Sequence, residues 1–492
     1  MTSPRDPSPA LSGDPVLTAG MKRANFFPVR AAVLVVVLSL AANSLAGDEL
    51  VKGNIQDKVV CLDDPGQSYA LYLPSAYDPA KAWPILYAFD PGGRAREPLT
   101  RFRDAAEVRG VIVACSYNSK NGPWEPIFAA AIAMWNDTHA RLSIDDRRVF
   151  AAGFSGGARA ASILSTMTGR PVAGVIACGA GIPEGVGIDK IGPCAFCGIV
   201  GTADFNYDEV VGLDTLLDKR PDIPHWIRTF DGTHAWPPIP LCTDALEWLD
   251  LVSAKKAGLA ADGTLAGALI ANAAARATAL ESEGAIFRAV AELDAAASAL
   301  SGLGDTAGLA EAAARLRGTD AFKKSARNEA EYGRKEDALL TELARTLTAV
   351  ERTMVLRREL SGFYAAVDEL VETARKARDA SETAFARRVL LNVAVQANER
   401  GSRFLDEGSP LKAVLCFEIA VRASEHEPAR RANMLYNLAC AHARGGSRRS
   451  ALASLRRAVE SGFANKALLL EDKDFDALRE TPEFQEILSN IR

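Results

Sequence analysis

The sequence predicts an α/β protein in which a doubly wound, mostly parallel sheet is followed by an all-helical region. Short apolar runs alternate with longer amphipathic runs up to about residue 252, as expected of strands and helices that alternate along the chain. Beyond this point the chain is rich in Ala, Leu, Glu and Arg and nearly free of β-branched runs, which favours helices. Small and apolar residues recur near the C-terminus, which indicates a helical repeat.

Short segments in the first part of the chain have the length and apolar composition of buried strands. Longer segments between and after them carry apolar residues at helical spacing. The predicted strands are 69–73, 84–89, 111–116, 148–153, 174–178, 195–201 and 226–230. The predicted helices are 126–142, 157–167, 207–217 and 242–252. Together these elements predict one complete α/β domain over residues 47–252.

The chain has 492 residues, more than one ordinary hydrophobic core accommodates. We therefore expect a leader at 1–46, the α/β domain at 47–252, an Ala-rich helical region at 253–378 and a repeat domain at 379–492. Apolar residues make up 48% and charged residues 24%, which is typical of folded proteins. The formal net charge of -5 gives no basic excess for binding phosphates, which argues against nucleic acid as a partner.

The N-terminal segment has the pattern of a secretory signal peptide. Residues 21–23 are Met-Lys-Arg, the apolar run 31–42 follows, and small residues end the segment. This pattern predicts cleavage after Ala46 and a secreted or periplasmic protein, with Met21 favoured over Met1 as the start. The apolar run is short for a membrane span, and an uncleaved N-terminal anchor is the alternative.

All eight cysteines follow the predicted cleavage point, in a compartment where disulfides could persist. Their pairing does not follow from the sequence. Cys194 and Cys197 have the spacing of a redox motif or half of a zinc site, but no second pair or histidine cluster stands at ligand spacing. We therefore expect core thiols or a structural disulfide, and no metal site.

The C-terminal region contains an internal repeat, in which Gly401 corresponds to Ala439 after a step of 38 residues. The other matched positions are Gly408 with Gly446, Ala413 with Ala451, Phe417 with Leu455, and Ala420 with Ala458. The pattern resembles the tetratricopeptide repeat, whose period is about 34 residues, with a short insertion. The resemblance covers residues 379–492 and implies a binding surface for a protein partner. A generic helical bundle is the alternative.

The strongest motif is Gly-Phe-Ser-Gly-Gly at residues 153–157. It follows an apolar strand at 149–152 and begins a helix, which is the setting of a nucleophile elbow. Glycines are needed there because the strand-to-helix turn is strained and the backbone passes close to itself. The motif therefore predicts Ser155 as a nucleophile.

An activated serine needs a base and an acid that orients the base, in the chain order Ser, acid, His for this kind of turn. Asp204 follows the predicted strand 195–201, and His234 follows the strand 226–230. Both therefore lie at carboxyl ends of strands, where parallel sheets place their functional groups. The sequence predicts a catalytic triad of Ser155, Asp204 and His234.

Other assignments of the acid and the base are possible. His139 falls within a predicted helix, and His225 stands at the beginning of its strand, so neither is at the expected edge of the sheet. Asp208 is the alternative acid. Asp204 could also serve only as the N-cap of the helix that follows it.

The oxyanion of an acyl-transfer intermediate needs two backbone N–H donors. One is expected from Gly156, directly after the nucleophile. The other is expected from the loop after the strand 84–89, which is Asp-Pro-Gly-Gly-Arg. Pro91 has no N–H, so Gly92 and Gly93 are the candidates. A simple tight turn is the alternative for these glycines.

In these contexts Ser155, Asp204 and His234 resemble the polyhydroxybutyrate-depolymerase and feruloyl-esterase branch of the α/β hydrolases. The resemblance covers residues 50–252 and implies an exported serine esterase that acts through an acyl-enzyme, with an ester substrate and no metal or organic cofactor. Members of this branch often carry His-Gly where this chain has Asp-Pro at residues 90–91, a departure that bears on the oxyanion geometry and the substrate.

Trp124 and Trp236 are candidate residues for an acyl or aryl binding pocket, and packing is the alternative role for each. A peptidase of the prolyl-oligopeptidase type shares the expected fold and elbow, but it normally carries a large extra N-terminal domain. A binding or scaffold protein with an inert hydrolase domain is the alternative from another class. The ordered triad argues against it.

Overall fold

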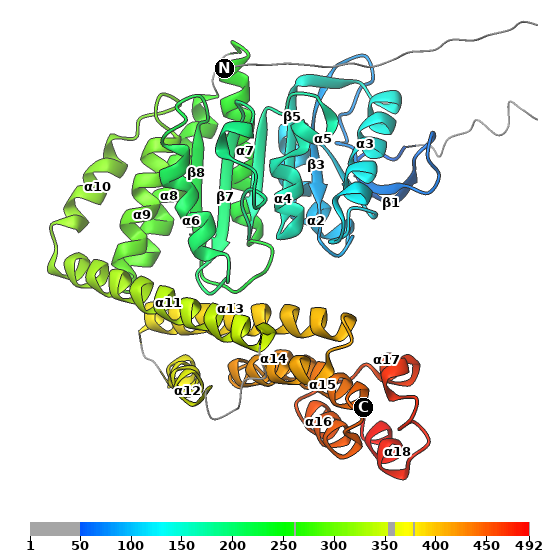
Figure 1. Ribbon diagram of the computed structural model, residues 1–492. Helices are drawn as coiled ribbons and strands as arrows, with labels where there is room; N and C mark the ends of the chain where they lie inside the picture. Colours follow the sequence, from blue (N-terminus) through cyan, green and yellow to red (C-terminus); the bar gives the residue numbers. More distant parts are fainter. Residues whose placement is uncertain (1–49, 260–261, 353–359, 377–378, 492) are drawn as a thin grey trace, which may run out of the picture. The chain divides into compact units, whose positions relative to one another are not determined.

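A computed structural model describes residues 50–259, 262–352, 360–376 and 379–491 (Figure 1). The predicted signal segment, its cleavage site and the two candidate start residues lie outside the described residues. No helix among the described residues is both long enough and apolar enough to cross a membrane.

The centre of the protein is an eight-stranded sheet in the order β1-β2-β4-β3-β5-β6-β7-β8. β1 and β2 are antiparallel to their neighbours, and all other pairs are parallel. The strands are β1 (Ile55–Val60), β2 (Ser68–Tyr72), β3 (Trp83–Phe89), β4 (Ile112–Ser116), β5 (Ile144–Phe154), β6 (Gly174–Cys178), β7 (Ala195–Gly201) and β8 (His225–Phe230).

The seven predicted strands are all present, and β6 and β7 have the predicted bounds. β1 was not predicted because it is an edge strand: Gln56, Asp57 and Lys58 interrupt its apolar pattern, and half of its residues are exposed. Edge strands often carry such charged residues, which discourage pairing with other chains.

Helices cover both faces of the sheet. α2 (Arg96–Arg109) and α7 (Ile239–Lys256) pack on one face. α3 (Trp124–Arg141), α4 (Gly156–Ser162), α5 (Leu164–Thr168) and α6 (Tyr207–Leu217) pack on the other. α2 was not predicted because its exposed face is highly charged. The predicted helix 157–167 is divided at Ile163, which has a non-helical backbone. This three-layer arrangement is the α/β-hydrolase fold.

Three more helices extend the same hydrophobic core beyond residue 252. They are α8 (Gly263–Ser282), α9 (Ile286–Ala299) and α10 (Ala307–Arg317), and their apolar residues cluster with those of α2 and α7. The indole N–H of Trp248 on α7 donates to the carbonyl of Ala299 at 3.0 Å. The boundary predicted after residue 252 stays a prediction, and the described core runs across it.

The remaining helices form a second hydrophobic core. They are α11 (Asp320–Arg352), α12 (Ser361–Lys376), α13 (Ala380–Asp406), α14 (Pro410–Ala423), α15 (Pro428–Arg444), α16 (Arg448–Glu460), α17 (Lys466–Glu471) and α18 (Pro482–Ser489). The helical C-terminal region is therefore confirmed.

The predicted repeat corresponds to two successive helical pairs, α13 with α14 and α15 with α16. Gly408 and Gly446 both follow the first helix of a pair and have φ of +71° and +73°. A β-carbon on Gly401 would lie 2.7 Å from the ring of Phe417, so this glycine allows the helices to cross closely. The assignment to the tetratricopeptide family stays a prediction.

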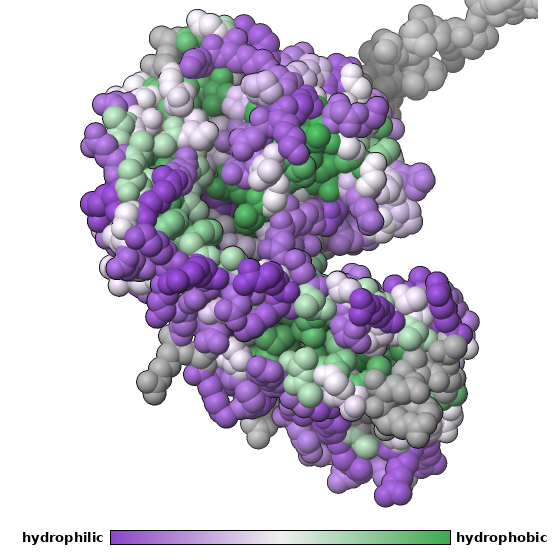
Figure 2. All heavy atoms as spheres, turned by 60° about the vertical axis from the view of Figure 1, so that its left-hand side comes forward, coloured by the Kyte–Doolittle hydropathy of each residue, from purple (hydrophilic) through white to green (hydrophobic). Residues whose placement is uncertain are grey.

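Hydrophilic side chains cover most of the face that Figure 2 shows, with apolar residues between them. All eight cysteines are buried free thiols. Burial raises the pKa of Cys194 to about 11 and that of Cys197 to about 12. Core thiols and a structural disulfide were the two outcomes expected for Cys194 and Cys197. In the structure these residues are core thiols.

Candidate active site

Ser155 stands at the turn between β5 and α4. Its φ is 54°, and it is the one residue other than glycine with a positive φ in the described part of the chain. A backbone of this kind costs on the order of 1–3 kcal/mol and persists only where the surroundings enforce it. Here the Ser155 N–H donates to the carbonyl of Cys178 at 2.8 Å, and α4 begins directly after the turn.

The glycines of the motif allow the backbone contacts around this turn. A β-carbon on Gly153 would lie 2.0 Å from the carbonyl oxygen of Gly157. A β-carbon on Gly157 would lie 2.1 Å from the carbonyl oxygen of Phe89 at the end of β3. Neither position has room for a side chain, so the sequence motif and the shape of the turn are directly linked.

The structure brings Ser155, His234 and Asp204 together at the carboxyl ends of β5, β8 and β7. The Ser155 Oγ lies 2.9 Å from the His234 Nε2, and the His234 Nδ1 lies 2.9 Å from both carboxylate oxygens of Asp204. Since a carboxylate accepts, the Nδ1 carries the proton, and the Nε2 is free to accept the hydroxyl proton of Ser155. The side chain of Asp204 is fully buried, whereas that of His234 is 18% exposed.

Asp204 is held by the acid loop, which we define as residues 202–206. Its Oδ1 also accepts from the N–H of Asn206 at 2.9 Å, and the side chain of Asn206 donates to the carbonyl of Gly179 at 2.7 Å. α6 begins at Tyr207 with Asn206 as its N-cap residue. Asp204 is therefore directed to His234 and does not cap the helix.

Two aromatic rings that the sequence analysis did not single out flank the imidazole. The ring centroids of Phe154 and Phe205 lie 4.6 and 4.3 Å from that of His234. Both residues adjoin a predicted catalytic residue in the sequence, which is the signal that could have identified them. They shield the Asp204–His234 hydrogen bond from water, where it would be weaker.

The alternative acid and bases lie elsewhere. His139 on α3 bonds to the carbonyl of Trp135 and to the carboxylate of Asp146. His225 at the start of β8 pairs with Asp214 at 3.4 Å. Asp208 lies in the first turn of α6.

The predicted oxyanion loop follows β3, but its N–H groups are engaged within the loop. The Gly92 N–H donates to Asp90 Oδ1 at 2.9 Å, and the Gly93 N–H donates to the Asp90 carbonyl at 2.9 Å. Gly93 has φ of +67°. The role of these two glycines in binding an oxyanion stays a prediction, and it would require one N–H to leave its present acceptor.

The side chain of Asp90, which was not predicted to be a site residue, holds this loop in place. It is fully buried and accepts from the guanidinium of Arg94 and, at 2.9 Å, from the indole N–H of Trp236. Burial alone would raise the pKa of Asp90, but these hydrogen bonds and that of the Gly92 N–H hold it below its ordinary value. Asp90 is therefore a buried carboxylate.

Asn121 lies beside the N-terminus of α4, in a loop that offered no sequence signal. A β-carbon on Gly156 would lie 1.9 Å from the carboxamide oxygen of Asn121. The backbone N–H of Asn121 donates to the carbonyl of Pro91 at 2.9 Å, which ties this loop to the oxyanion loop. The carboxamide is thus placed next to the residue that follows the nucleophile.

The two tryptophans predicted to contact substrate have different settings. Trp236 is buried, and its ring centroid lies 5.7 Å from that of Phe154, so it packs between the elbow strand and Asp90. Trp124 begins α3, is 37% exposed and packs on Phe128. Their role in binding substrate stays a prediction.

One group of side chains has the composition of a metal site. Ligand atoms of Cys440, Asp472 and Asp474 lie within 4.8 Å of one another. Burial and the neighbouring carboxylates raise the pKa of the Cys440 thiol, and both this thiol and the hydroxyl of Tyr436 donate to Asp472. Cys440 and Tyr436 are therefore both hydrogen-bonded to Asp472.

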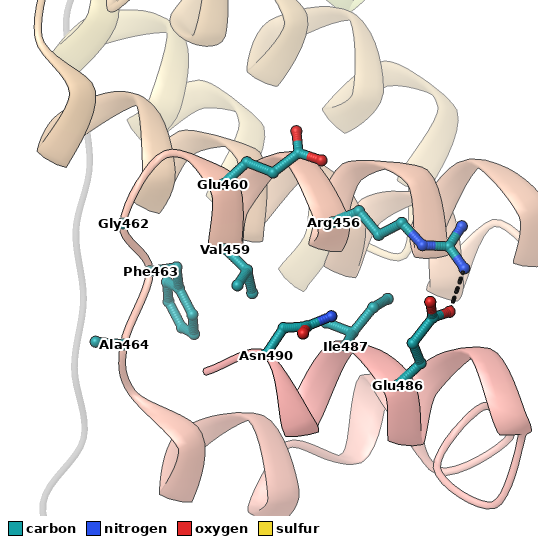
Figure 3. Close-up of a pocket in the computed structure, with 9 residues that line it drawn as sticks. All are labelled: Arg456, Val459, Glu460, Gly462, Phe463, Ala464, Glu486, Ile487 and Asn490. Carbon is teal, nitrogen blue, oxygen red and sulfur yellow. Dashed lines mark hydrogen bonds and ion pairs between the residues drawn. The ribbon is translucent and has the colours of Figure 1, made fainter. Parts of the chain in front are cut away.

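A cavity of about 620 Å³ lies between α16 and α18 (Figure 3). None of the predicted catalytic residues lines it. Arg456 and Glu486 form an ion pair of 3.1 Å on one side, and Phe463 and Ile487 provide apolar lining. None of its lining residues is Ser, Thr, Cys or His, so the cavity does not hold the residues of a serine- or cysteine-dependent hydrolase site.

A scan against models of protein families finds no match to the sequence, and a search of curated proteins finds none either. Among solved structures, the chain is similar to a ferulic acid esterase at 16% identity and a TM-score of 0.32, over 42% of this chain and 99% of the other. It is also similar to an S-formylglutathione hydrolase from Staphylococcus aureus at 11% identity and a TM-score of 0.33, over 41% and 98%. An esterase from Pyrobaculum calidifontis aligns at 14% identity and a TM-score of 0.32, over 46% and 90%.

Proposed function

We propose that this protein is a serine hydrolase that cleaves carboxylic esters. The observation that carries the proposal is the continuous hydrogen-bonded chain from Ser155 through His234 to the buried Asp204, with 2.9 Å at each step. Its nucleophile stands on a strained turn, at which the Ser155 N–H donates to the carbonyl of Cys178. Such an arrangement activates a hydroxyl that is otherwise a weak nucleophile.

The reaction follows from the positions of these groups. The His234 Nε2 accepts the proton of Ser155 as the Oγ attacks the acyl carbonyl, and the imidazolium is stabilised by Asp204. The same proton then passes to the leaving alkoxide, which departs as an alcohol. Water, deprotonated by His234, attacks the acyl-enzyme, and the carboxylic acid leaves as Ser155 regains its proton.

We assign the oxyanion site to the N–H of Gly156 and the carboxamide of Asn121. The Asn121 side chain lies against Gly156, and its Nδ2, the atom that would donate, lies 3.1 Å from where a β-carbon on Gly156 would be. Asparagine side chains can supply such a donor. Gly92 and Gly93 remain the predicted alternative, and their N–H groups would have to turn away from Asp90.

The finer parts of the proposal come from the sequence. The resemblance to polyhydroxybutyrate depolymerases and feruloyl esterases favours a polymer or aryl ester as substrate. The N-terminal segment favours export, and the helical repeats favour a protein partner.

The experiment compares turnover of a nitrophenyl-ester panel with that of an aminoacyl-anilide panel by the full chain. We expect cleavage of esters and little cleavage of anilides. His234→Ala should reduce ester turnover by about 10⁴-fold or more. His139→Gln is the matched control and should keep wild-type turnover, since His139 lies outside the site. Turnover of anilides but not esters would replace the esterase assignment with that of a peptidase.

A further inference from the structure

A side chain from the helical region reaches the acid loop. Arg388 on α13 donates from its Nη1 to the carbonyl oxygen of Thr202 at 3.0 Å. Thr202 is two residues before Asp204 in the same loop. The contact joins residues 186 positions apart in the sequence.

The guanidinium of Arg388 has a fixed direction. Its Nε and Nη2 both donate to one carboxylate oxygen of Glu336 on α11, at 2.9 and 2.7 Å. Both side chains are buried, with Arg388 5% and Glu336 1% exposed. A guanidinium is planar and rigid, so holding two of its nitrogens leaves the third aimed at the acid loop.

A second contact from the same face of α13 reaches the other side of Asp204. The side chain of Asn392 donates to the carbonyl of Phe205 at 3.3 Å. Arg388 and Asn392 are four residues apart, which places them on one face of the helix. The guanidinium of Arg388 also lies 4.4 Å from the ring centroid of Tyr207, the first residue of α6. One helix thus contacts the acid loop on both sides of Asp204.

We propose that Arg388, oriented by Glu336, is a positioning residue of the active site, and that α13 fixes the acid loop so that Asp204 stays in line with His234. The inference rests on the proposed function. By this proposal the helical region supports the active site and is not an independent appended domain.

The expected loss in kcat depends on how far Asp204 can move from His234 without loss of activity. Asp204 meets His234 at 2.9 Å, and a displacement of about 1 Å in a catalytic group costs on the order of 100-fold in rate. Removing the function of the acid altogether costs about 10⁴-fold, which sets the upper limit. None of the predicted catalytic or oxyanion residues lies on α13, so we expect the KM for a small ester to change little.

The test uses the full chain and three variants. Arg388→Met combined with Glu336→Gln removes the pair without leaving a buried charge unpaired, Asn392→Ala removes the second contact, and Arg388→Lys retains a cation. Arg400→Met is the control. Arg400 also lies on α13, but it pairs with Glu351 and does not contact the acid loop. For each protein, kcat and KM for a nitrophenyl ester, the Tm, and the amide hydrogen exchange of residues 202–206 are measured.

We expect the double variant to lower kcat by about 10- to 100-fold with KM changed less than about twofold, and to speed amide exchange in the acid loop. Asn392→Ala should show a smaller change in the same direction, Arg388→Lys should recover part of kcat, and Arg400→Met should match the wild type. Wild-type kcat, or unchanged exchange at residues 202–206, in a folded double variant would overturn the proposal.

The exchange measurement separates this proposal from the proposed function. If the wild type cleaves no ester in the panel, the esterase assignment fails. Faster exchange of the acid loop in the double variant alone would then still support the contact as a determinant of the loop, whereas unchanged exchange would reject it.

Discussion

Arg228 on β8 and Glu292 on α9 form a buried ion pair with an N–O distance of 2.7 Å. The guanidinium also bonds to Asp244 on α7 at 2.8 Å, and Arg228 is 1% exposed. This pair joins the last strand of the sheet to a helix beyond residue 252. Breaking a buried pair by removing one partner costs about 3–5 kcal/mol, because the other charge is left uncompensated.

The first prediction concerns fragments of the chain. A fragment of residues 50–252 lacks Glu292 and exposes the apolar face beneath α8 and α9, so it should be unfolded or aggregated. A fragment of residues 50–318 keeps Glu292 and the helices α8 and α9 that cover this apolar face. It should therefore be soluble and unfold in a cooperative urea transition. Circular dichroism and urea denaturation make the comparison. A cooperative transition of the shorter fragment at the same urea midpoint as the longer one would show that the catalytic unit ends near residue 252.

The second prediction concerns pH and Asp90. Because its folded-state pKa is held below the ordinary value, Asp90 stabilises the fold above its unfolded pKa of about 4, and this contribution is lost as the pH falls through the folded pKa. We expect Asp90→Asn to reduce the free energy of unfolding by about 1–3 kcal/mol at neutral pH. The difference from wild type should shrink as the pH drops below about 4.

Urea denaturation of both proteins between about pH 2.5 and 7 measures this difference. Arg147→Gln is the control, since Arg147 pairs with Asp145 away from the site. A difference between wild type and Asp90→Asn that stays constant over this range would show that the carboxylate is not the source of the stabilisation.

The third prediction concerns the strained turn. Ser155→Gly and Ser155→Ala both remove the hydroxyl, but only glycine tolerates a φ of 54° without strain. We expect Ser155→Gly to be more stable than Ser155→Ala by about 1 kcal/mol, since the strain relieved exceeds the extra entropy of glycine in the unfolded chain. Thermal and urea unfolding provide the comparison. Equal or lower stability of the glycine variant would mean that the turn is not strained.

The fourth prediction concerns Asn121. If its carboxamide donates to the oxyanion, Asn121→Ala should lower kcat by about 100- to 1,000-fold with little change in KM, as expected of a contact made only in the transition state. Asn118→Ala is the control, because Asn118 lies in the same loop but donates to the carbonyl of Gly66. Equal kcat values for Asn121→Ala and wild type would return the assignment to Gly92 and Gly93.

Elements and residues that are marked by a pattern within a short stretch of sequence could be predicted. The strands β6 and β7 were predicted to the residue, because fully buried parallel strands are continuous apolar runs bounded by turn residues. Ser155, Asp204 and His234 could be selected from the sequence because each follows a strand in a recognisable context, and the structure brings their side chains together. Ser155 also carries the glycines that its turn requires.

Contacts between distant segments could not be predicted in this way. The Trp236–Asp90 hydrogen bond joins residues 146 positions apart, and the Arg388–Thr202 contact spans 186. Neither depends on a periodicity or a short motif. The engagement of the Gly92 N–H by Asp90 was missed for a related reason, since it depends on a side-chain rotamer within the loop.

The most direct test of the proposed chemistry is covalent labelling of the nucleophile in the native protein. A fluorophosphonate probe reacts with a serine that its base has activated, so peptide mass spectrometry of the labelled full chain should place one adduct on Ser155. Ser155→Ala should give no adduct, and His234→Ala should label far more slowly. Buried Ser162 on α4 bonds to the carbonyl of Ala158, so Ser162→Ala should label like the wild type. A folded wild-type protein that gives no adduct, or an adduct on another residue, would contradict the assignment of Ser155 as the nucleophile.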